Sequence, residues 1–381
     1  MRRRWLYATC DHGFEAVLAD ELADLGAVSI EPGHRGVAFE ADREGCWRIT
    51  LASRIANRVL VPLAEFPAYD RASLHAGVER IDWPGWFDLD RTFAVDASSH
   101  RSNEAHTGFI AQVAKDAICD RFRAETGRRP SVDRRRPDVV INVHLAEDHC
   151  TVSLDAAGAR LHRRGWRGPT GEAPLKETLA AGMLRLIGWQ PDVPLFDPMC
   201  GSGTFLIEAA LMARRLAPGL LRLGGEGFAC QRWAGHDAEA FEAVVTGLRQ
   251  QGRHAAPLLV GRDADPDAIR AARLNARHAG VDDLIRFDVG SLRTARAPER
   301  PGVILTNPPY GARLEADEAL YRDLGDTFKQ QFPGWTAWVF TSTEAPIRSI
   351  GLKPSRKIPL RNGPIDCRLC RYDLYAGGEP G

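Results

Sequence analysis

The C-terminal half of the chain alternates short apolar runs with longer amphipathic stretches. Four apolar runs have the length and composition of buried strands: residues 193–197, 258–262, 284–287 and 303–306. Helical patterns follow the first two runs, at residues 205–216 and 267–279. Strands that alternate with helices predict an α/β fold with a doubly wound, mostly parallel sheet.

The C-terminal end of the chain departs from this alternation. A helical pattern over residues 321–331 and a strand over 335–341 precede two further segments, residues 353–360 and 367–375, of which the second alternates. The turn residues Asn362-Gly363-Pro364 separate the two segments, which predicts a closing antiparallel hairpin. A parallel sheet with an antiparallel last strand favours a class I S-adenosylmethionine-binding fold over a nicotinamide-binding one.

The N-terminal half mixes helical and strand patterns. A helical stripe over residues 14–25 precedes a hairpin pattern at 28–30 and 37–39, and residues 46–60 predict a second helix that ends before Pro62. A strand, a helix and two strands are predicted after it: residues 92–96, 108–122, 139–145 and 150–154. This half therefore predicts α+β structure.

Length and composition indicate a globular protein of two or three domains. The chain has 381 residues, of which 44% are hydrophobic and 26% charged. No stretch is long or apolar enough to span a bilayer, and no signal-peptide core follows the basic N-terminus. Eight scattered cysteines indicate a reduced, cytoplasmic protein. The pair Cys367 and Cys370 lies in a predicted strand without a second pair, so we expect no metal site.

Charge is distributed unevenly, although the formal net charge is zero. Residues 121–170 hold eleven arginines and six acidic residues, a local net charge of +5. Arg134, Arg135 and Arg136 stand just before a predicted strand, in a loop at the rim of the sheet from which they can contact phosphates. Solvated arginines without a partner are the alternative, and the charge pattern alone does not decide between the two.

A glycine-rich turn joins the first of the four apolar runs to its helix. Its sequence, Asp197-Pro198-Met199-Cys200-Gly201-Ser202-Gly203-Thr204, lets a ligand approach the backbone and meet a helix N-terminus. Leu206 stands where a dinucleotide fingerprint has its third glycine, and no Gly-Lys-Ser/Thr follows as in a phosphate loop. Asp263 ends the second run, which is where a ribose diol needs a two-point acceptor.

The stretch Asn307-Pro308-Pro309-Tyr310-Gly311 follows the fourth run. Two prolines fix φ and remove two backbone donors, so the strand ends in a rigid, extended turn. The Asn307 side chain and the Pro308 carbonyl can accept the protons of a planar amine while Tyr310 stacks on its ring. Such acceptors favour the pyramidal, more nucleophilic nitrogen of the transition state. A proline-stiffened loop without chemistry explains this stretch equally well when it is taken alone.

Four polar residues stand at the ends of successive predicted strands: Asp197, Asp263, Asp288 and Asn307. Doubly wound sheets bind ligands at the carboxyl ends of their parallel strands. The four residues are therefore expected at one edge of the sheet, and this convergence is more specific than any single motif.

The chain resembles a known family in four stretches of this half: DPMCGSGTFLIEAA (197–210), GRDADPDAIRAARLNARHAGV (261–281), RFDVGSL (286–292) and NPPYG (307–311). They look like class I methyltransferases that act on exocyclic amines. Further stretches extend the resemblance over nearly the whole chain: ATCDHGFEAVLADEL (8–22), LHRRGWR (161–167), APLKETLAAGML (173–184) and NGPIDCRLCRYDLY (362–375). The chain thus resembles the THUMP-domain RNA methyltransferases related to the bacterial enzyme that makes N2-methylguanosine in 23S ribosomal RNA. It departs from them in having Trp166 in place of a tyrosine, and it lacks the second, C-terminal methyltransferase domain that some relatives have.

The resemblance implies S-adenosylmethionine as cofactor, no metal, and direct methyl transfer to a base amine, guanine N2 of 23S ribosomal RNA. It implies these cofactor-binding residues: Asp197, Pro198, Cys200, Gly201, Gly203, Thr204, Asp263, Asp265 and Asp288. It implies these catalytic residues: Asn307, Pro308, Pro309 and Tyr310. It implies these RNA-binding residues: Arg134, Arg135, Arg136, Arg163, Arg164, Trp166 and Arg167. The target base must leave its stack to reach such a site.

The resemblance also implies an order of domains. We expect a ferredoxin-like subdomain over residues 1–60, a THUMP-like RNA-binding domain over 61–160, a basic linker and helix over 161–190, and a seven-stranded methyltransferase domain over 191–381. Residues 218–252 are expected to be a plain surface excursion, with a cover over the base pocket as the alternative. A monomer or weak dimer is expected.

Other functions stay open at the level of sequence. Transfer RNA guanine N2 or adenine N6, and adenine N6 of DNA, are alternative substrates, because the same asparagine–proline grip suits each amine. A non-catalytic RNA-binding or ribosome assembly factor is a candidate of another class, and failure to bind S-adenosylmethionine would favour it. A dehydrogenase is disfavoured because the third glycine of the fingerprint is missing.

Overall fold

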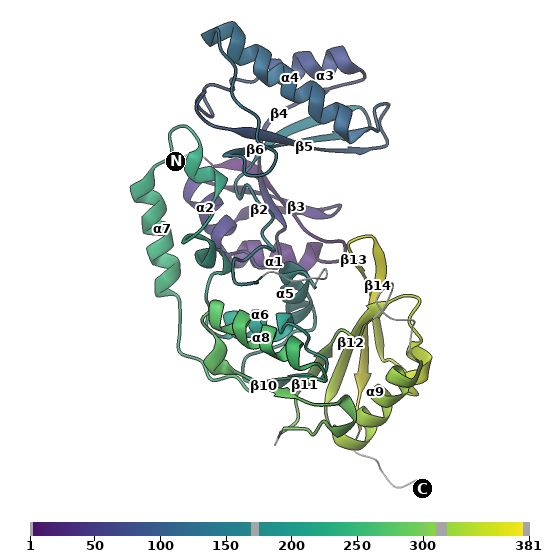
Figure 1. Ribbon diagram of the computed structural model, residues 1–381. Helices are drawn as coiled ribbons and strands as arrows, with labels where there is room; N and C mark the ends of the chain where they lie inside the picture. The colour runs from purple at the N-terminus through teal and green to yellow at the C-terminus, as the bar shows by residue number, and fades with distance from the viewer. Residues whose placement is uncertain (1–2, 169–174, 299, 310–317, 376–381) are drawn as a thin grey trace. The chain divides into compact units, whose positions relative to one another are not determined.

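The computed structural model describes residues 3–168, 175–298, 300–309 and 318–375 (Figure 1). Tyr310 and Gly311, named above, lie outside these residues. The chain divides into two compact units. The N-terminal unit comprises Met1–Cys10, Leu18–Leu161 and Arg222–Leu248, and the C-terminal unit comprises Asp11–Val17, His162–Leu221 and Arg249–Gly381.

One seven-stranded sheet runs through the N-terminal unit in the order β2-β3-β1-β4-β7-β6-β5. Its strands are β1 (Arg4–Thr9), β2 (Val28–Gly33), β3 (Gly36–Ala41), β4 (Arg58–Pro67), β5 (Phe93–His100), β6 (Val139–Ala146) and β7 (His149–Asp155). The pair β5 and β6 is parallel, and the other pairs are antiparallel. The helices that lie between these strands in the sequence are α1 (Glu15–Asp24), α2 (Arg43–Ala52), α3 (Arg71–Glu79) and α4 (Thr107–Thr126).

The helix expected over residues 46–60 is wrong in its second half, because β4 begins at Arg58. The buried Glu21 carboxylate accepts hydrogen bonds from the Ser53 hydroxyl at 2.7 Å and from the Arg54 and Ile55 amides. These contacts draw the backbone out of the helix at Ser53, which has extended dihedral angles. β4 then pairs with both β1 and β7, so one sheet continues across residue 60.

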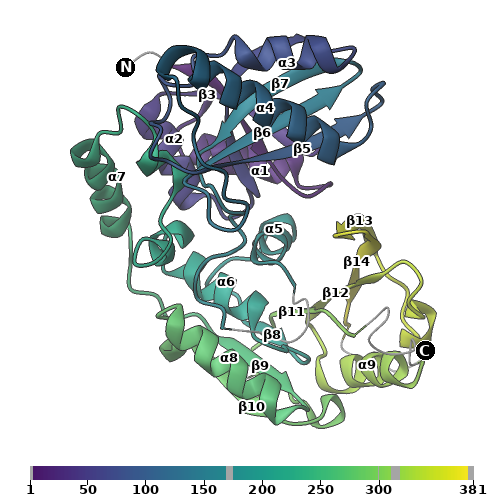
Figure 2. The same cartoon turned by 45° about the horizontal axis from the view of Figure 1, so that its top comes forward.

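Helices α3 and α4 lie together on one face of the part of the sheet formed by β4 to β7 (Figure 2). The α4 helix has the apolar stripe expected from the sequence, with Ile110, Val113 and Phe122 buried. The Phe122 ring packs 5.0 Å from the Phe87 ring, measured between centroids. Gly127 ends the helix with φ of +71°, a conformation that glycine adopts without cost.

Residues 218–252 are not the plain surface excursion expected from the sequence, because most of them, residues 222–248, pack within the N-terminal unit. Phe228, Ala229 and Cys230 are almost completely buried, and the Cys230 amide donates to the Ala156 carbonyl at 3.0 Å. The segment continues into α7 (Ala238–Gln250), which contributes an aromatic contact to Trp47. Residues 222–248 therefore contribute to the hydrophobic core of the N-terminal unit.

The C-terminal unit contains a second seven-stranded sheet in the order β10-β9-β8-β11-β12-β14-β13. Its strands are β8 (Leu195–Asp197), β9 (Leu259–Asp263), β10 (Ile285–Val289), β11 (Val303–Thr306), β12 (Thr336–Ser342), β13 (Arg356–Asn362) and β14 (Ile365–Asp373). Its helices include α5 (Glu177–Leu186), α6 (Thr204–Ala213), α8 (Pro266–His278) and α9 (Glu318–Gln331). The first five strands are parallel, and β14 is antiparallel to β12 and β13. The predicted fold class and closing hairpin are confirmed.

Parallel register brings the candidate residues to one edge of this sheet. Asp197 ends β8 opposite Gly261 of β9, and Asp263 ends β9 opposite Val289 of β10. Asn307 directly follows β11, which pairs with β8. The carboxyl ends of the four strands thus present these side chains at the position where such sheets bind ligands.

Candidate active site

The Asp197 carboxyl group is buried at the end of β8, with 2% of the residue exposed. Its Oδ1 accepts a hydrogen bond from the Met199 amide at 3.2 Å. Burial raises the pKa of Asp197 to about 7, the hydrogen bond from the Met199 amide opposes this rise, and the charge of Asp263 adds to it. The Asp197 carboxyl group thus holds the start of the turn in place, and its burial makes ionisation of this group costly.

The glycine-rich turn is braced by Asp263. Asp263 Oδ2 accepts the Gly201 amide at 2.8 Å, and its Oδ1 accepts the Asp265 amide at 3.0 Å. Gly203 has φ of +83°, and a Cβ there would lie 3.1 Å from the Phe287 ring, so any other residue at this position would be strained. Gly201 also has a positive φ, but a Cβ there would meet no atom within 4 Å. The turn therefore presents an open backbone surface at Gly201.

The remaining predicted cofactor residues differ in exposure. Asp265 is exposed and caps α8 by accepting the Asp267 amide at 2.8 Å. Asp288 stays partly exposed and pairs with Arg286 at 3.0 Å. Pro198 and Cys200 are buried, and burial raises the pKa of the Cys200 thiol well above its ordinary value. A thiol held neutral in this way is unsuited to act as a nucleophile.

The Asn307 side chain has an unsatisfied oxygen at this edge. Its Oδ1 is buried, and no hydrogen-bond partner for it occurs in the part of the chain that the structure describes. The hydroxyl of Thr306, the last residue of β11, is likewise buried without a partner among the described residues. Pro308 is buried and Pro309 partly buried. An amide oxygen that is removed from water without a partner costs about 1–3 kcal/mol. Such an atom at the carboxyl edge of the sheet is a candidate for contact with a substrate N–H.

The predicted RNA-binding arginines of the N-terminal unit are exposed. Arg134, Arg135 and Arg136 form a loop whose backbone is ordered by Asp133, since Asp133 Oδ1 accepts the Arg135 and Arg136 amides at 2.7 and 3.1 Å. Those two bonds hold the pKa of Asp133 below its ordinary value. The three guanidinium groups are thus free to extend from a fixed backbone.

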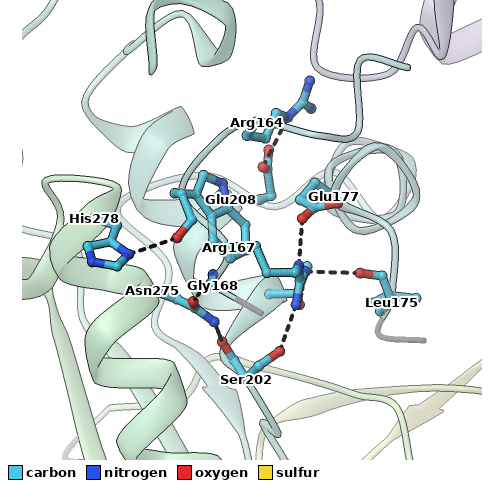
Figure 3. Close-up of polar contacts among 11 residues, drawn as sticks. Arg164, Arg167, Gly168, Leu175, Glu177, Ser202, Glu208, Asn275 and His278 are labelled. Atoms are coloured by element: carbon cyan, nitrogen blue, oxygen red, sulfur yellow. Dashed lines mark hydrogen bonds and ion pairs between the residues drawn. The ribbon is translucent and has the colours of Figure 1, made fainter. Parts of the chain in front are cut away.

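The basic segment over residues 163–167 is placed differently from the expectation. Arg163 is exposed, but Arg164 and Trp166 are only 2% and 1% exposed, which is not the position that direct contact with RNA requires. Arg164 Nε pairs with the buried Glu208 of α6 at 3.3 Å (Figure 3). Arg167 is turned toward Glu177 and Ser202 of the C-terminal unit (Figure 3). We therefore withdraw Arg164, Trp166 and Arg167 as direct RNA contacts.

Two residues of this network were not anticipated from the sequence. Glu177 in the first turn of α5 binds the Arg167 guanidinium at 2.7 Å. Asn275, buried on α8, joins Gly168 to the Ser202 carbonyl (Figure 3). The sequence signal that could have identified Asn275 is its position on the apolar face of α8, between Ala272 and Ala276. A polar residue on such a face needs partners within the fold.

Among the residues that the structure describes, no helix is long and apolar enough to cross a membrane. Within the same residues, no group of three or more histidine, cysteine or acidic side chains could hold a metal ion.

Three family models match the chain. An RlmL ferredoxin-like domain matches residues 5–60, and a THUMP domain matches residues 68–155. The RMKL-like methyltransferase domain matches residues 164–371, more than half of the 381 residues. The chain belongs to the RMKL-like methyltransferase family. The expected resemblance is thereby confirmed, and the cofactor of this methyltransferase family is S-adenosylmethionine.

Relatives with curated names agree with this family. The chain is 40% identical over 374 residues to slr0064 of Synechocystis sp., which is named as a candidate RNA methyltransferase. That match covers 97% of this chain and 96% of the relative. It is 44% identical over 383 residues to the ribosomal RNA large subunit methyltransferase K/L of Syntrophotalea carbinolica. That match covers 97% of this chain but 53% of the relative, so the chain spans about half the length of the K/L protein.

Solved structures of similar proteins match nearly the whole length of this chain. The crystal structure of SMU.472 complexed with SAH has a TM-score of 0.87 and 30% sequence identity, and the match covers 99% of this chain and 100% of that chain. A structure from Listeria monocytogenes, titled a predicted N6-adenine-specific DNA methylase, has a TM-score of 0.86 and 31% identity. That match covers 98% of this chain and 97% of that chain.

Proposed function

We propose that this chain transfers a methyl group from S-adenosylmethionine to an exocyclic amine of an RNA base, namely guanine N2 of 23S ribosomal RNA. The observation that carries the proposal is the buried Asn307 Oδ1, unpartnered among the described residues, at the carboxyl edge of the sheet. A substrate N–H would satisfy this atom. Its hydrogen bond would favour the pyramidal nitrogen needed for attack on a methyl group.

The donor set at this edge fits S-adenosylmethionine. Gly201 leaves open space beside its α-carbon, so a ligand can approach the backbone of the turn. An ionised carboxylate has about four acceptor positions, so Asp263 can bind ribose hydroxyls in addition to the two amides that it already holds. Asp288 is partly exposed and can accept the adenine amine. We assign Asp197, Pro198, Cys200, Gly203 and Thr204 to the walls and support of this pocket.

The cofactor supplies an electrophilic methyl group when it is bound, and the chain's own residues orient the amine. Asn307 Oδ1 and the Pro308 carbonyl are assigned to accept its two protons, with Pro309 holding the turn rigid and Tyr310 assigned to the base ring. No covalent bond to the enzyme is required. The buried, neutral Cys200 thiol agrees with a direct transfer.

Three observations support RNA as the substrate. The THUMP domain match, the names of the slr0064 and K/L relatives, and the exposed arginine loop at Arg134–Arg136 each point to RNA. We assign this loop and Arg163 to the RNA backbone. The domain order from the sequence, a cytoplasmic location and a monomeric or weakly dimeric state complete the proposal.

Methyl transfer in vitro tests the proposal most simply. Purified protein with isotope-labelled S-adenosylmethionine is expected to label unmodified 23S ribosomal RNA, and digestion should place the label in N2-methylguanosine. The Asn307→Ala variant should lose at least about a hundredfold in kcat, because one oriented acceptor in a dry site contributes on that scale. Its dissociation constant for S-adenosylhomocysteine should stay within about twofold of the wild type. Equal losses of turnover and cofactor binding would contradict the role given to Asn307.

One observation favours a second function. The Listeria monocytogenes structure that shares 31% identity is titled an N6-adenine-specific DNA methylase, and an asparagine–proline grip also suits that amine. Label appearing in N6-methyladenine of duplex DNA, with none in ribosomal RNA, would establish this alternative.

A further inference from the structure

The segment that enters the C-terminal unit, Arg163 to Gly168, is bonded directly to the glycine-rich turn. Arg167 donates from one terminal nitrogen to the Ser202 hydroxyl at 2.8 Å and from the other to the Thr204 hydroxyl at 3.0 Å. Ser202 and Thr204 flank Gly203. The guanidinium therefore holds the turn on both sides of a residue whose own backbone has little intrinsic preference.

The remaining donors of Arg167 are used on the opposite side. Its Nε donates to Glu177 Oε1 at 2.7 Å, and a terminal nitrogen donates to the Leu175 carbonyl at 3.2 Å (Figure 3). The Trp166 ring lies beneath the guanidinium carbon, 4.7 Å from its centroid. The ion pair is largely withdrawn from water, with the two side chains 14% and 5% exposed. A planar fork with its donors so occupied is fixed in one orientation.

Asn275 on α8 makes a second link between the basic segment and the glycine-rich turn. Its Oδ1 accepts the Gly168 amide at 3.2 Å, and its Nδ2 donates to the Ser202 carbonyl at 3.1 Å (Figure 3). Asn275 is 2% exposed, so both bonds lie inside the unit. The turn and the segment are thus joined twice, once through Arg167 and once through Asn275.

We infer that Arg167 and Asn275 are positioning residues that hold the Gly201–Thr204 turn in the shape that binds S-adenosylmethionine. The inference rests on the proposed placement of the cofactor against that turn. It gives the basic segment a role in cofactor affinity in place of the RNA contact expected from its charge. Arg163, exposed in the same segment, remains available to RNA.

The test compares the binding of S-adenosylhomocysteine with steady-state constants for both substrates. Arg167→Ala should raise the dissociation constant and the KM for S-adenosylmethionine by about tenfold or more, because hydrogen bonds to a charged group are lost. The KM for RNA should stay unchanged. Arg167→Lys should restore little, because an ammonium keeps the charge but cannot make the fork. Arg322→Ala, exposed on α9, is the control and should leave cofactor binding and the KM for RNA unchanged.

A double-mutant cycle separates positioning from a general loss of stability. Ser202→Ala removes one acceptor of Arg167. Made in the wild-type chain, it should raise the dissociation constant for S-adenosylhomocysteine by about threefold, and made in the Arg167→Ala variant it should cause no further rise. If Arg167→Ala does not fold, Ser202→Ala and Asn275→Ser carry the test, each with a folded thermal transition as its control. Cofactor binding within twofold of the wild type in these folded variants would overturn the inference. If Asp263→Ala also left binding unchanged, the placement of the cofactor itself would be wrong.

Discussion

At the scale of single residues, one carboxylate serves two purposes. Asp263 fixes the glycine-rich turn through the Gly201 amide and is assigned to bind the ribose of the cofactor. Asp197 beside it is buried and holds the start of the same turn. Substitution of Asp263 is therefore expected to change cofactor affinity, and substitution of Asp197 is expected to change the stability of the fold.

Asp263→Ala is expected to raise the dissociation constant for S-adenosylhomocysteine by at least about tenfold, since it removes a charged acceptor. Asp263→Asn keeps one acceptor oxygen and should cost less. Isothermal calorimetry measures both, and Asp267→Asn on the exposed first turn of α8 is the control. An unchanged dissociation constant in Asp263→Ala would remove the ribose assignment.

Asp197 is expected to make stability depend on pH. Its pKa rises from 3.8 to about 7 in the folded protein, so between these values the folded state holds a proton that the unfolded state releases. Stability therefore falls as pH rises through this range, by a few kcal/mol on the order given by the shift. Urea unfolding at pH 4, 5.5, 7 and 8 should show a decline in the wild type that is reduced in Asp197→Asn. Parallel profiles would contradict the raised pKa.

The residues of the site were predictable to different degrees. Asp197, Asp263, Asp288 and Asn307 could be placed because the length of an apolar run shows where its strand ends. Arg164 and Arg167 were misplaced because their burial depends on Glu208 and Glu177, which a charge pattern does not connect with them. A local sequence pattern shows where a strand begins and ends, whereas a buried ion pair depends on how distant segments pack in the fold.

At the scale of elements, β4 shows how tertiary contact overrides a local pattern. The run over residues 46–60 has helical spacing, but the Glu21 carboxylate holds the Ser53 hydroxyl and the amides of Arg54 and Ile55. The chain leaves the helix there and enters a central strand. The elements of the C-terminal sheet were predicted more completely, because a helical pattern or a turn signal separates most of its apolar runs.

Glu21→Ala should destabilise the N-terminal unit by about 2–4 kcal/mol, because it leaves several buried donors without an acceptor. Denaturant unfolding, followed by tryptophan fluorescence, measures the change. Asp20→Ala, exposed on the same helix, should stay within about 0.5 kcal/mol of the wild type. Equal effects of the two substitutions would show that Glu21 does not hold the start of β4.

At the scale of the whole molecule, the chain passes repeatedly between its two units. Residues 222–248 lie between α6 and β9 in sequence, yet they bury Phe228 and Cys230 in the N-terminal unit. The sequence was interpreted there as a plain surface excursion. Apolar residues in a sequence indicate that a segment is buried, but they do not indicate which hydrophobic core it joins. Chemistry is assigned to the C-terminal unit and much of the RNA contact to the N-terminal unit.

Replacing Arg134, Arg135 and Arg136 with glutamine should weaken RNA binding and lower its salt dependence. Each lost phosphate contact reduces the slope of log K against log salt by about 1, or less for single strands. Filter binding from 50 to 300 mM salt measures the slope, and cofactor affinity should not change. Arg322→Gln, exposed on α9, is the control. A wild-type slope in the triple variant would place the RNA on another surface.

Nucleoside mass spectrometry of size-fractionated RNA tests the central claim most directly. Cells without this gene, complemented with the wild type or with Asn307→Ala, provide the comparison. The account predicts that N2-methylguanosine in the large ribosomal RNA is lost without the gene, restored by the wild type and not restored by the variant. Loss from transfer RNA alone would keep the chemistry and change the substrate. Unchanged methylated nucleosides in every RNA fraction would contradict the claim that this chain methylates RNA.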